Sequence, residues 1–531
     1  MPFELIEVPR PIGMNSDLNP YELPPTVWNN SVNIANTRGR NNKARGATPR
    51  YTGNVCPIDP MFCLSWNDGT DPTWLLASTD AIYKVNISDT YANYTDTVGF
   101  PSGYSASWAE GWTGDVFNGV GIMNNTIDPP LYTAPSNTME ELDNWPPNFK
   151  AKVVRPFKNR LIALNVDRNT GNGFEPSTVL WSSAADVGSV PSSWDITDPA
   201  TGAGDNILSD SDGAIVDGKA LGNSFIIYKE DSVWAMDFVG GAFVYSFRKL
   251  FSDEEGVLSR DCVVEFEGKH FVVGKSDIYV HDGTSKRSLA SSRIADMIYG
   301  RLDDVFGKRI KCVADYSNKN IWVYFVPFGD YNEDGTTNPY PEATEAMVWN
   351  WESDSWSKRT LYNVAHIGVG IIVDASGDTW EDGGEVTWDE DTGLWDEGTD
   401  VNEKASLLIA DGTNSQLLEA ESGTLWDTTS LVATLEKKGV DFEDQRVWKK
   451  INAIYPKMDG DGVVDIYVGH EDPPGSGVTY EGPYSFSIGE DYKVNCRVHG
   501  RNIALRIVST DDTQWSLTAL GIEWKPTATR R

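Results

Sequence analysis

Residues 269–283, KHFVVGKSDIYVHDG, set the pattern for the whole chain. An apolar run, FVV, meets a polar turn, GKSD, and a second apolar run, IYV, follows before the closing DG. β-branched and aromatic residues on both sides of a Gly/Ser/Asp turn are typical of two paired antiparallel strands. The same unit recurs at 224–237, where FIIY and VWAM flank KEDS, and at 74–85, where WLLA and AIYKV flank STD. The sequence therefore predicts an all-β chain built from many hairpins.

Such hairpins recur from about residue 60 to about residue 420 and indicate a β-propeller. Most gaps between them lie near the ~40–50-residue period of propeller blades. One hairpin cannot bury both of its faces, whereas radially stacked four-stranded sheets can. We therefore expect about seven blades, with six or eight as alternatives and a set of β-sandwiches as the competing architecture. The first strands of the seven hairpins begin near Leu75, Val120, Leu161, Phe225, Phe271, Ile321 and Leu407.

The two ends of the chain differ from this body. Residues 1–55 are rich in Pro, Asn and Arg, and their prolines forbid a regular helix, so we expect an extended N-terminal arm that docks on the main body or on a neighbouring subunit. The propeller body then spans 56–428. Five or six alternating strands within 429–531 predict a C-terminal β-sandwich-like domain. The best helix candidate is 291–302, with Ser291 or Ser292 as its N-cap.

Charge and cysteine content narrow the function classes. The formal net charge of −34 over 531 residues repels phosphate backbones, which argues against wrapping or reading nucleic acid and suits a passage that DNA crosses without sticking. The five cysteines are scattered and form no CxxC, so buried thiols are expected rather than disulfides or a zinc site. No apolar run is long enough to span a membrane, and the first residues do not resemble a secretory signal.

One short motif is a candidate metal site. The stretch 330–335, DYNEDG, places Asp330, Asn332 and Asp334 at alternate positions before Gly335. Alternate oxygen ligands can converge on one hard cation, and the glycine permits the sharp turn that a calcium loop needs. Calcium is therefore the candidate cofactor, and an ordinary acidic loop is the alternative. A similar run, DGDG at 459–462, is expected to be a hairpin turn.

A tandem acidic repeat occupies 374–400. Each of its tryptophans precedes two carboxylates, a pattern that suits short turns in which the ring packs on the body while the acids stay in water. A solvated loop is the simple interpretation. The alternative is an acidic rim on a channel or a partner site. The repeated units are Trp380-Glu381-Asp382, Trp388-Asp389-Glu390 and Trp395-Asp396-Glu397.

Motifs of nucleophilic and metal-assisted catalysis are absent from the sequence. It contains no GxSxG, no HExxH and no GxxxxGK[ST]. The five histidines form no pair at i, i+4, and each is expected to be a strand or surface residue. We therefore expect a protein that is not an enzyme, without catalytic residues.

Residues 11–46 carry an opening that resembles tail proteins of short-tailed bacteriophages. In that family the opening typically runs G-[LI]-N-x-D-x-x-P-x-E-L-P-x-G-x-W, followed by a strand rich in Asn and Arg. Met14 replaces the Leu or Ile, and Thr26 stands where the pattern has Gly. The closing stretch 498–531 resembles the last strands of the same family. The matching positions are Gly13, Asn15, Asp17, Pro20, Glu22, Leu23, Pro24 and Trp28.

The chain thus resembles the tail nozzle or hub proteins, also called stabilisation proteins, of podovirus-like phages. The resemblance implies a structural virion protein, assembled in the bacterial host cytoplasm, that forms a homo-hexamer below the portal and adaptor. DNA is ejected through it without specific binding, and tail fibres or a tailspike, and a needle or plug, attach to it. No catalytic residues come with the family. The arm residues expected to dock partners are Asn15, Asp17, Pro20, Glu22, Trp28, Arg38 and Arg45.

Two other functions compete with this one. A carbohydrate-binding or glycan-cleaving propeller that acts in host-receptor recognition would need a central pocket with stacked Trp rings and a close pair of carboxylates. A calcium-dependent adhesion module would depend on the 330–335 loop.

Overall fold

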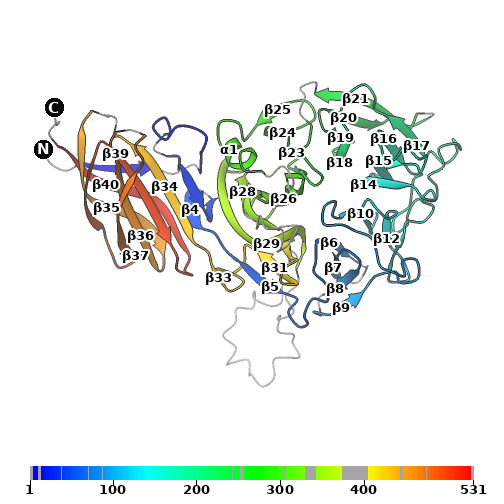
Figure 1. The fold of residues 1–531 in the computed structure, drawn as a ribbon, viewed down its shortest axis with the longest axis horizontal. Helices are drawn as coiled ribbons and strands as arrows, with labels where there is room; N and C mark the ends of the chain where they lie inside the picture. The colour runs from blue at the N-terminus through cyan, green and yellow to red at the C-terminus, as the bar shows by residue number, and fades with distance from the viewer. Residues whose placement is uncertain are drawn as a thin grey trace, which may run out of the picture.

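The computed structural model describes residues 4–9, 13–24, 26–37, 39–67, 69, 71–86, 88–241, 243–251, 256–302, 307–328, 342–372, 405–442, 446–473 and 475–527. Within these ranges the chain is nearly all-β, with one α-helix, α1 (Ala295–Tyr299), and one 3-10 helix, η1 (Gly307–Arg309). A ring of sheets lies beside a separate pair of sheets, and both chain ends lie at the far end of the pair (Figure 1). The protein is a β-propeller joined to a β-sandwich. No helix in these ranges has the length and apolar character that a membrane crossing needs.

The hairpin predicted at 269–283 is confirmed. It consists of β23 (Lys269–Val273) and β24 (Ile278–His281), which pair antiparallel and form the middle of a four-stranded sheet. Both apolar runs are buried on their two faces, because each sheet of the ring is packed between two others. This double burial explains why the strands are continuously apolar rather than alternating.

Seven four-stranded blades form the ring within the described residues, and the first five follow one another along the chain. Blade 1 comprises β6 (Phe62–Asn67), β7 (Pro72–Ala77), β8 (Ile82–Val85) and β9 (Tyr91–Asn93). Blade 2 comprises β10 (Thr113–Phe117), β11 (Val120–Asn124), β12 (Leu131–Thr133) and β13 (Met139–Glu141). Blade 3 comprises β14 (Lys150–Phe157), β15 (Arg160–Asp167), β16 (Glu175–Trp181) and β17 (Gly204–Ile207).

Blades 4 and 5 repeat this arrangement. Blade 4 comprises β18 (Ile215–Leu221), β19 (Ser224–Lys229), β20 (Val233–Phe238) and β21 (Tyr245–Phe251). Blade 5 comprises β22 (Val263–Phe266), β23, β24 and β25 (Lys286–Ser288).

Blades 6 and 7 share one long strand, β29 (Ser355–Ile371), which begins as the outermost strand of blade 6 and ends as the innermost strand of blade 7. The exchange falls between Thr360 and Val364, where the register shifts on both sides and Asn363 has a φ of 54°. The other strands of blade 6 are β26 (Lys311–Asp315), β27 (Asn320–Phe325) and β28 (Ala343–Asn350). The others of blade 7 are β30 (Ala405–Asp411), β31 (Gln416–Ala420) and β5 (Ala47–Arg50).

The ring is closed. Each innermost strand contacts the innermost strands on either side of it, in the order β6, β10, β14, β18, β22, β26, β29 and back to β6. All seven positions counted along the sequence lie in the second strand of a blade, so the prediction of seven blades is confirmed. The ring closes only because β5, from the N-terminal segment, completes blade 7 beside β31. Two short strands, β32 (Leu425–Trp426) and β33 (Thr429–Ser430), extend the sheet beyond β5.

The sandwich consists of two facing sheets with one apolar core. The first has the order β2 (Asn30–Val32), β34 (Ala433–Val440), β39 (Asn502–Ser509), β36 (Val463–Glu471) and β37 (Thr479–Ser487). In the second, β40 (Trp515–Thr527) lies between β35 (Trp448–Gly460) and two arm strands, β1 (Glu4–Pro9) and β4 (Arg40–Lys43). Its margins are β38 (Val494–Gly500) beside β35 and β3 (Ile34–Thr37) beside β4.

The segment predicted as an extended arm is built into both halves. It contributes β1, β3 and β4 to one sheet of the sandwich and β5 to the propeller. Its strand β2 pairs with β34 of the sandwich on one side and with β29 of blade 6, through Val32 and Lys358, on the other. One hydrogen-bonded sheet therefore runs from the propeller into the sandwich.

Three local predictions are corrected. Of the helix predicted over 291–302, only the part from Ala295 to Tyr299 is helical. Neither Ser291 nor Ser292 is its N-cap, because Ile294 holds that position. Ser292 has a φ of 58°. The DGDG run at 459–462 is not a hairpin turn, because it links β35 and β36, which lie in different sheets. Of the sandwich strands, β34 and β35 were not predicted, since their lysines break the apolar pattern. The buried lysines Lys437 and Lys449 lie on these two strands.

Candidate functional site

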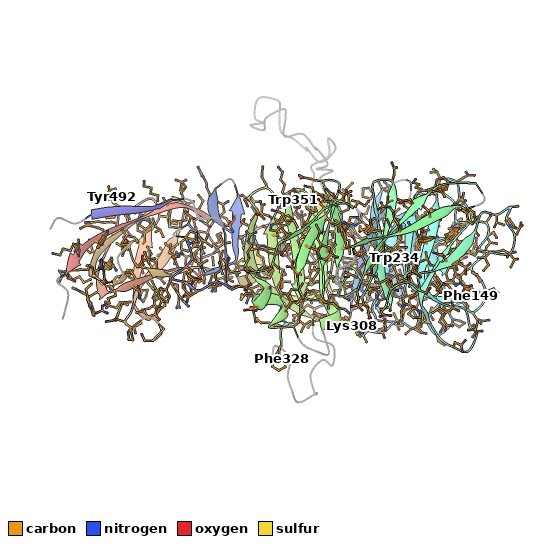
Figure 2. All side chains as sticks on the ribbon, turned by 90° about the horizontal axis from the view of Figure 1, so that it is seen from above. Phe149, Trp234, Lys308, Phe328, Trp351 and Tyr492 are labelled. Carbon is orange, nitrogen blue, oxygen red and sulfur yellow. The ribbon has the colours of Figure 1, made fainter. Side chains whose placement is uncertain are left out.

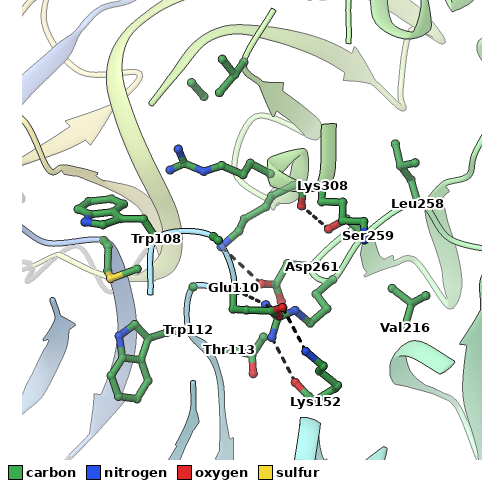
Figure 3. Close-up of a pocket in the computed structure, with 18 of the residues that line it drawn as sticks. Trp108, Glu110, Trp112, Thr113, Lys152, Val216, Leu258, Ser259, Asp261 and Lys308 are labelled. Atoms are coloured by element: carbon green, nitrogen blue, oxygen red, sulfur yellow. Dashed lines mark hydrogen bonds and ion pairs between the residues drawn. The ribbon is translucent and has the colours of Figure 1, made fainter. Parts of the chain in front are cut away.

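The propeller encloses a pocket on its axis, where the chain leads into the innermost strands (Figure 3). The cavity has a volume of about 280 Å³. It is lined by residues at or next to the first positions of these strands, among them Thr113 on β10, Ile215 on β18 and Lys311 on β26. Because every blade presents the same end of its innermost strand, residues far apart in the sequence meet here.

Beside this pocket Arg155, on β14, joins three blades. Its Nε and Nη2 donate hydrogen bonds of 2.9 Å each to the two carboxylate oxygens of Asp217 on β18. Its Nη2 also donates to Oδ1 of Asp261, just before β22, at 2.7 Å. The Arg155 and Asp217 side chains are only 8% and 4% exposed. Lys311 of blade 6 extends the series, with its Nζ 3.6 Å from the second oxygen of Asp261.

Pairing with opposite charge favours the ionised forms of Arg155 and Asp261. Burial alone would lower the pKa of Arg155, but Asp217 and Asp261 together hold that pKa well above its usual value. Burial alone would raise the pKa of Asp261, but Arg155 and then Lys311 bring it well below the usual range of a carboxyl. The Asp261 carboxylate is thus favoured in its ionised form and is not suited to donate a proton as a general acid.

A second ionic group lies at the same pocket and contains Glu110, Lys152 and Arg260. Nζ of Lys152 donates to Oε1 of Glu110 at 3.1 Å, and Nη2 of Arg260 donates to Oε2 of Glu110 at 3.2 Å. Arg260 also donates to the backbone oxygens of Glu110 and Lys152. The loop before β10 is thereby fixed to the loop before β22, and one carboxylate serves two cations (Figure 3).

The lining of the pocket carries more positive than negative charge. Its carboxylates are Glu110, Glu230 and Asp261, whereas five cationic side chains reach it. This balance is opposite to that of the whole chain, whose net charge is −34. The guanidinium of Arg309 lies 5.9 Å from the ring centroid of Trp108, which also lines the cavity. The cations are Lys152, Arg260, Lys308, Arg309 and Lys311.

Burial destabilises the charged form of three of these cations. Burial lowers the pKa of Lys311, and the attraction of Asp261 only partly opposes it. Burial also lowers the pKa of Arg260 and that of Arg309, with Glu110 and Glu342 as the respective opposing carboxylates. A buried cation with too little opposite charge favours any anion that can reach it. The arrangement is therefore suited to binding an anion.

Glu342, immediately before β28, is a carboxyl near the axis whose acidity is weakened. Burial, assisted by the charge of Asp411, raises the pKa of Glu342 to about 7. Its Oε2 accepts a hydrogen bond from Oγ1 of Thr413 at 3.1 Å. A carboxyl of this kind changes charge near neutral pH and can exchange a proton there.

The histidine closest to the axis, His366 on β29, is held neutral. Burial lowers the pKa of His366 well below its usual value, with the charge of Lys311 acting in the same direction. Its ring lies 4.4 Å from that of Phe62, and its Nδ1 lies 3.4 Å from both the backbone nitrogen and Sγ of Cys63. The five cysteines are free and buried, as predicted.

Three of the residues predicted to dock partners, Asn15, Asp17 and Trp28, contact their own chain. Nδ2 of Asn15 donates to the backbone oxygen of Ser292 at 3.0 Å, and the Asp17 carboxylate accepts a hydrogen bond of 2.7 Å from the backbone nitrogen of Ala295 at the start of α1. Trp28 is buried in the sandwich core and donates from Nε1 to Oδ1 of Asn41 at 3.2 Å. Of the two readings of the arm, docking on the main body is the one that the structure shows for these three residues.

The other arm residues differ. Glu22 and Arg45 are exposed, and Pro20 is half-buried next to Gly439. Arg38 lies outside the described residues. Outside them too lie the candidate calcium ligands Asp330, Asn332 and Asp334 and the acidic insertion at 374–400. Within the described ranges no group of three His, Cys, Asp or Glu side chains could hold a metal ion.

A buried polar network that no sequence pattern predicted lies between blades 4 and 5. The hydroxyl of Tyr228, on β19, lies 2.7 Å from Nδ1 of His270 and 2.6 Å from Nε2 of His281. Nε2 of His270 lies 2.8 Å from the backbone oxygen of Ala220, and Nδ1 of His281 accepts from the backbone nitrogen of Gly283 at 3.2 Å. The proton positions follow: His281 donates to Tyr228, Tyr228 donates to His270, and His270 donates to Ala220.

This histidine pair has no i, i+4 spacing, which is the spacing that brings two side chains together on a helix. His270 and His281 are directly opposite each other on β23 and β24. Spacing across the predicted hairpin would have paired them, since the turn fixes the register. The axial cations also have a positional signal. They lie at or just before the innermost strand of a blade, which is the strand that precedes each predicted hairpin.

Comparisons with known proteins find distant structural likeness alone. No protein-family model and no curated protein matches the chain. Streptogramin B lyase matches 79% of this chain and 97% of its own, at 9% identity and a TM-score of 0.36. AztD from Citrobacter koseri matches 56% of this chain and 72% of its own, at 11% identity and a TM-score of 0.32. A gluconolactonase from Xanthomonas campestris matches 56% of this chain and 94% of its own, at 9% identity and a TM-score of 0.29. Likeness this distant says nothing of what this chain does.

Proposed function

We propose that this chain is a structural subunit of a short-tailed bacteriophage tail, the nozzle or hub that assembles as a hexamer below the portal and adaptor. DNA leaves through the assembled ring, and fibres or a needle attach to it. The proposal starts from the resemblance of residues 11–46 to that family. One observation carries it further: the residues that match the family opening form the joint between the propeller and the sandwich.

The joint has two halves. On the propeller side, the backbone nitrogen of Met14 donates to the oxygen of Trp356 in blade 6 at 3.0 Å, and Asp17 binds the start of α1. On the sandwich side, Trp28 packs in the core, and its backbone nitrogen donates to the oxygen of Gly13 at 2.9 Å. A subunit that forms the wall of a tube has to keep its domains in fixed relation, and a motif kept for that purpose has no need of catalytic groups.

The channel for DNA would lie between subunits. The axial pocket of the propeller holds about 280 Å³, far too little for a duplex, and its wall is tied across blades by Arg155 and Asp261. A ring of subunits is therefore needed to enclose a lumen. With −34 on each chain, such a lumen would repel the phosphate backbone and let DNA slide.

The test is the state of assembly. The purified chain of 58.7 kDa is mixed with the portal–adaptor complex of the same phage and examined by light scattering and negative-stain microscopy. We expect six copies to bind as a ring, and we expect the protein in purified virions by mass spectrometry. A chain that stays monomeric with the portal–adaptor complex and is missing from virions would refute the proposal.

A carbohydrate-binding propeller is the second candidate, favoured by the presence of Trp108 in the axial pocket. The nearby acids Asp217 and Asp261 are bound to Arg155, which disfavours the glycan-cleaving form of this candidate. A glycan array with the native chain and with Trp108→Ala separates the two functions. Binding that is lost in the variant would support receptor recognition, and an array without signal would count against it.

A further inference from the structure

We infer that the axial pocket is a binding site for a small anion that carries a phosphate or carboxylate group. This inference is independent of the proposed tail function, because it rests on the charges and shape of the pocket alone. It also holds for a single subunit, since all of the lining residues come from one chain.

The first argument is charge balance within a confined space. Two of the lining carboxylates already serve two cations each: Glu110 binds Lys152 and Arg260, and Asp261 binds Arg155 and Lys311. The lining thus holds five cations against three carboxylates, and bringing in an anion would balance the difference. In a chain with a net charge of −34, such an excess of positive charge at one place is not a product of overall composition.

Second, the ammonium group of Lys311 is largely removed from water. Lys311 has a side chain that is 18% exposed, and its ion pair with Asp261 spans 3.6 Å, longer than a tight hydrogen bond. An ammonium group that is removed from water with an incomplete partner costs free energy. A phosphate or carboxylate in the pocket would recover that cost through charge-assisted hydrogen bonds. The lowered pKa values of Lys311 and Arg260 agree with this, because Asp261 and Glu110 only partly offset the effect of burial.

The third argument is the size and access of the pocket. A cavity of about 280 Å³ admits a ligand of a few to a dozen heavy atoms and excludes a nucleic acid strand or a folded partner. Lys308 is exposed and lies at one face of the propeller (Figure 2), whereas Lys311, on β26, has a side chain that is only 18% exposed. A ligand can therefore meet Lys308 on entering and Lys311 when bound, with Trp108 and Arg309 beside it.

The experiment is calorimetric titration of the full chain with inorganic phosphate and, separately, with citrate, at constant ionic strength in chloride. Binding of phosphate alone would assign a phosphate ligand, and binding of citrate alone a carboxylate ligand. Either anion should also raise the thermal midpoint. We expect Lys308→Ala and Lys311→Gln to weaken binding at least tenfold.

The matched control is Lys319→Ala. Lys319 is an exposed lysine that pairs with Glu352 and does not line the pocket. The Lys319→Ala variant should bind each anion with a dissociation constant within twofold of that of the native chain. Lys308→Ala is the decisive variant, because its exposed side chain can be removed without disturbing the fold. The inference is overturned if neither anion gives heat, or if Lys308→Ala and Lys319→Ala bind equally well.

Discussion

The carboxylate of Asp17 accepts hydrogen bonds from the backbone nitrogens of Ala295 and Asp296, at 2.7 and 3.3 Å. The N-terminal arm thereby caps a helix that lies 278 residues further along the chain. Helix α1 has no cap from its own neighbours, since its N-cap residue, Ile294, contributes no side-chain hydrogen bond. The arm is therefore part of the propeller and not a free extension.

Replacing Asp17 should loosen this contact. We expect Asp17→Ala to lower the free energy of unfolding by about 1 kcal/mol, the usual cost of losing a capping side chain. Urea denaturation followed by tryptophan fluorescence measures the change. Glu22→Ala is the control, because Glu22 belongs to the same arm and is exposed. Equal stability of the two variants would show that the cap contributes nothing.

Arg155 should be far more costly to replace than a surface arginine. Arg155→Met leaves Asp217 and Asp261 buried without their main cation, so we expect a loss of about 3–5 kcal/mol. Arg248→Ala is the matched comparison, because it breaks an ion pair with Asp237 whose side chains are 56% and 31% exposed. That variant should lose less than about 1 kcal/mol. Chemical denaturation of both proteins at neutral pH tests the difference.

The Tyr228 network should make the fold sensitive to acid. Burial lowers the pKa of His270 to about 3 and that of His281 to about 4. Unfolded histidine has a pKa of about 6.5, so below that pH the unfolded chain binds protons that the folded chain does not. Stability from each histidine is complete above pH 6.5 and is lost as the pH falls toward the folded value. At pH 5 the loss should be about 2 kcal/mol per histidine.

Comparison of unfolding free energies at pH 8 and pH 5 tests this. The double variant His270→Gln and His281→Gln should lose much of the difference, while His499→Gln, at an exposed position, should keep it. An unchanged pH dependence in the double variant would assign the acid sensitivity to other groups.

Closure of the ring depends on the approach of β5 to blade 7. A Cβ at Gly46 would overlap the backbone carbonyl of Leu425, and backbone atoms cannot yield as side chains do. We expect Gly46→Ala to cost about 1–3 kcal/mol by displacing the strand. Gly307→Ala is the control, because a Cβ there meets no atom of the described residues within 4 Å and its φ is not positive. Hydrogen exchange of β31 should rise in the first variant and not in the second.

The blades were predictable because their signal is local. An apolar run such as 271–273 followed by a polar turn specifies a hairpin wherever it occurs, and seven such hairpins specify a ring. The partner of β5 could not be predicted in the same way. Pairing between Thr48 and Glu419 joins residues that no local pattern connects, and the choice depends on which blade lacks a fourth strand.

The axial site was less predictable than the fold. Arg260, Lys308 and Arg309 come from the connections before strands, and Lys152 and Lys311 lie near the beginnings of β14 and β26. Lys and Arg are common at such positions and carry no pattern that marks them. Arg260 and Lys308 look like ordinary loop residues in the sequence. Only the closure of the ring brings them to one pocket, so their role depends on topology. The acidic residues carry a clearer sequence pattern, because they are abundant and clustered, as at Asp374 and the residues that follow it.

The pairing of β5 with β31 has a consequence for the way the protein is made. Residues 47–50 leave the ribosome early, yet their partner, at 416–420, is synthesised only after six other blades, tens of seconds later at about 5–20 residues per second. The first strand, β1, waits longer still, for β40. Until then both strands have unpaired edges in a crowded cell. The nascent chain must therefore be kept from pairing with its neighbours until β31 and β40 have been synthesised.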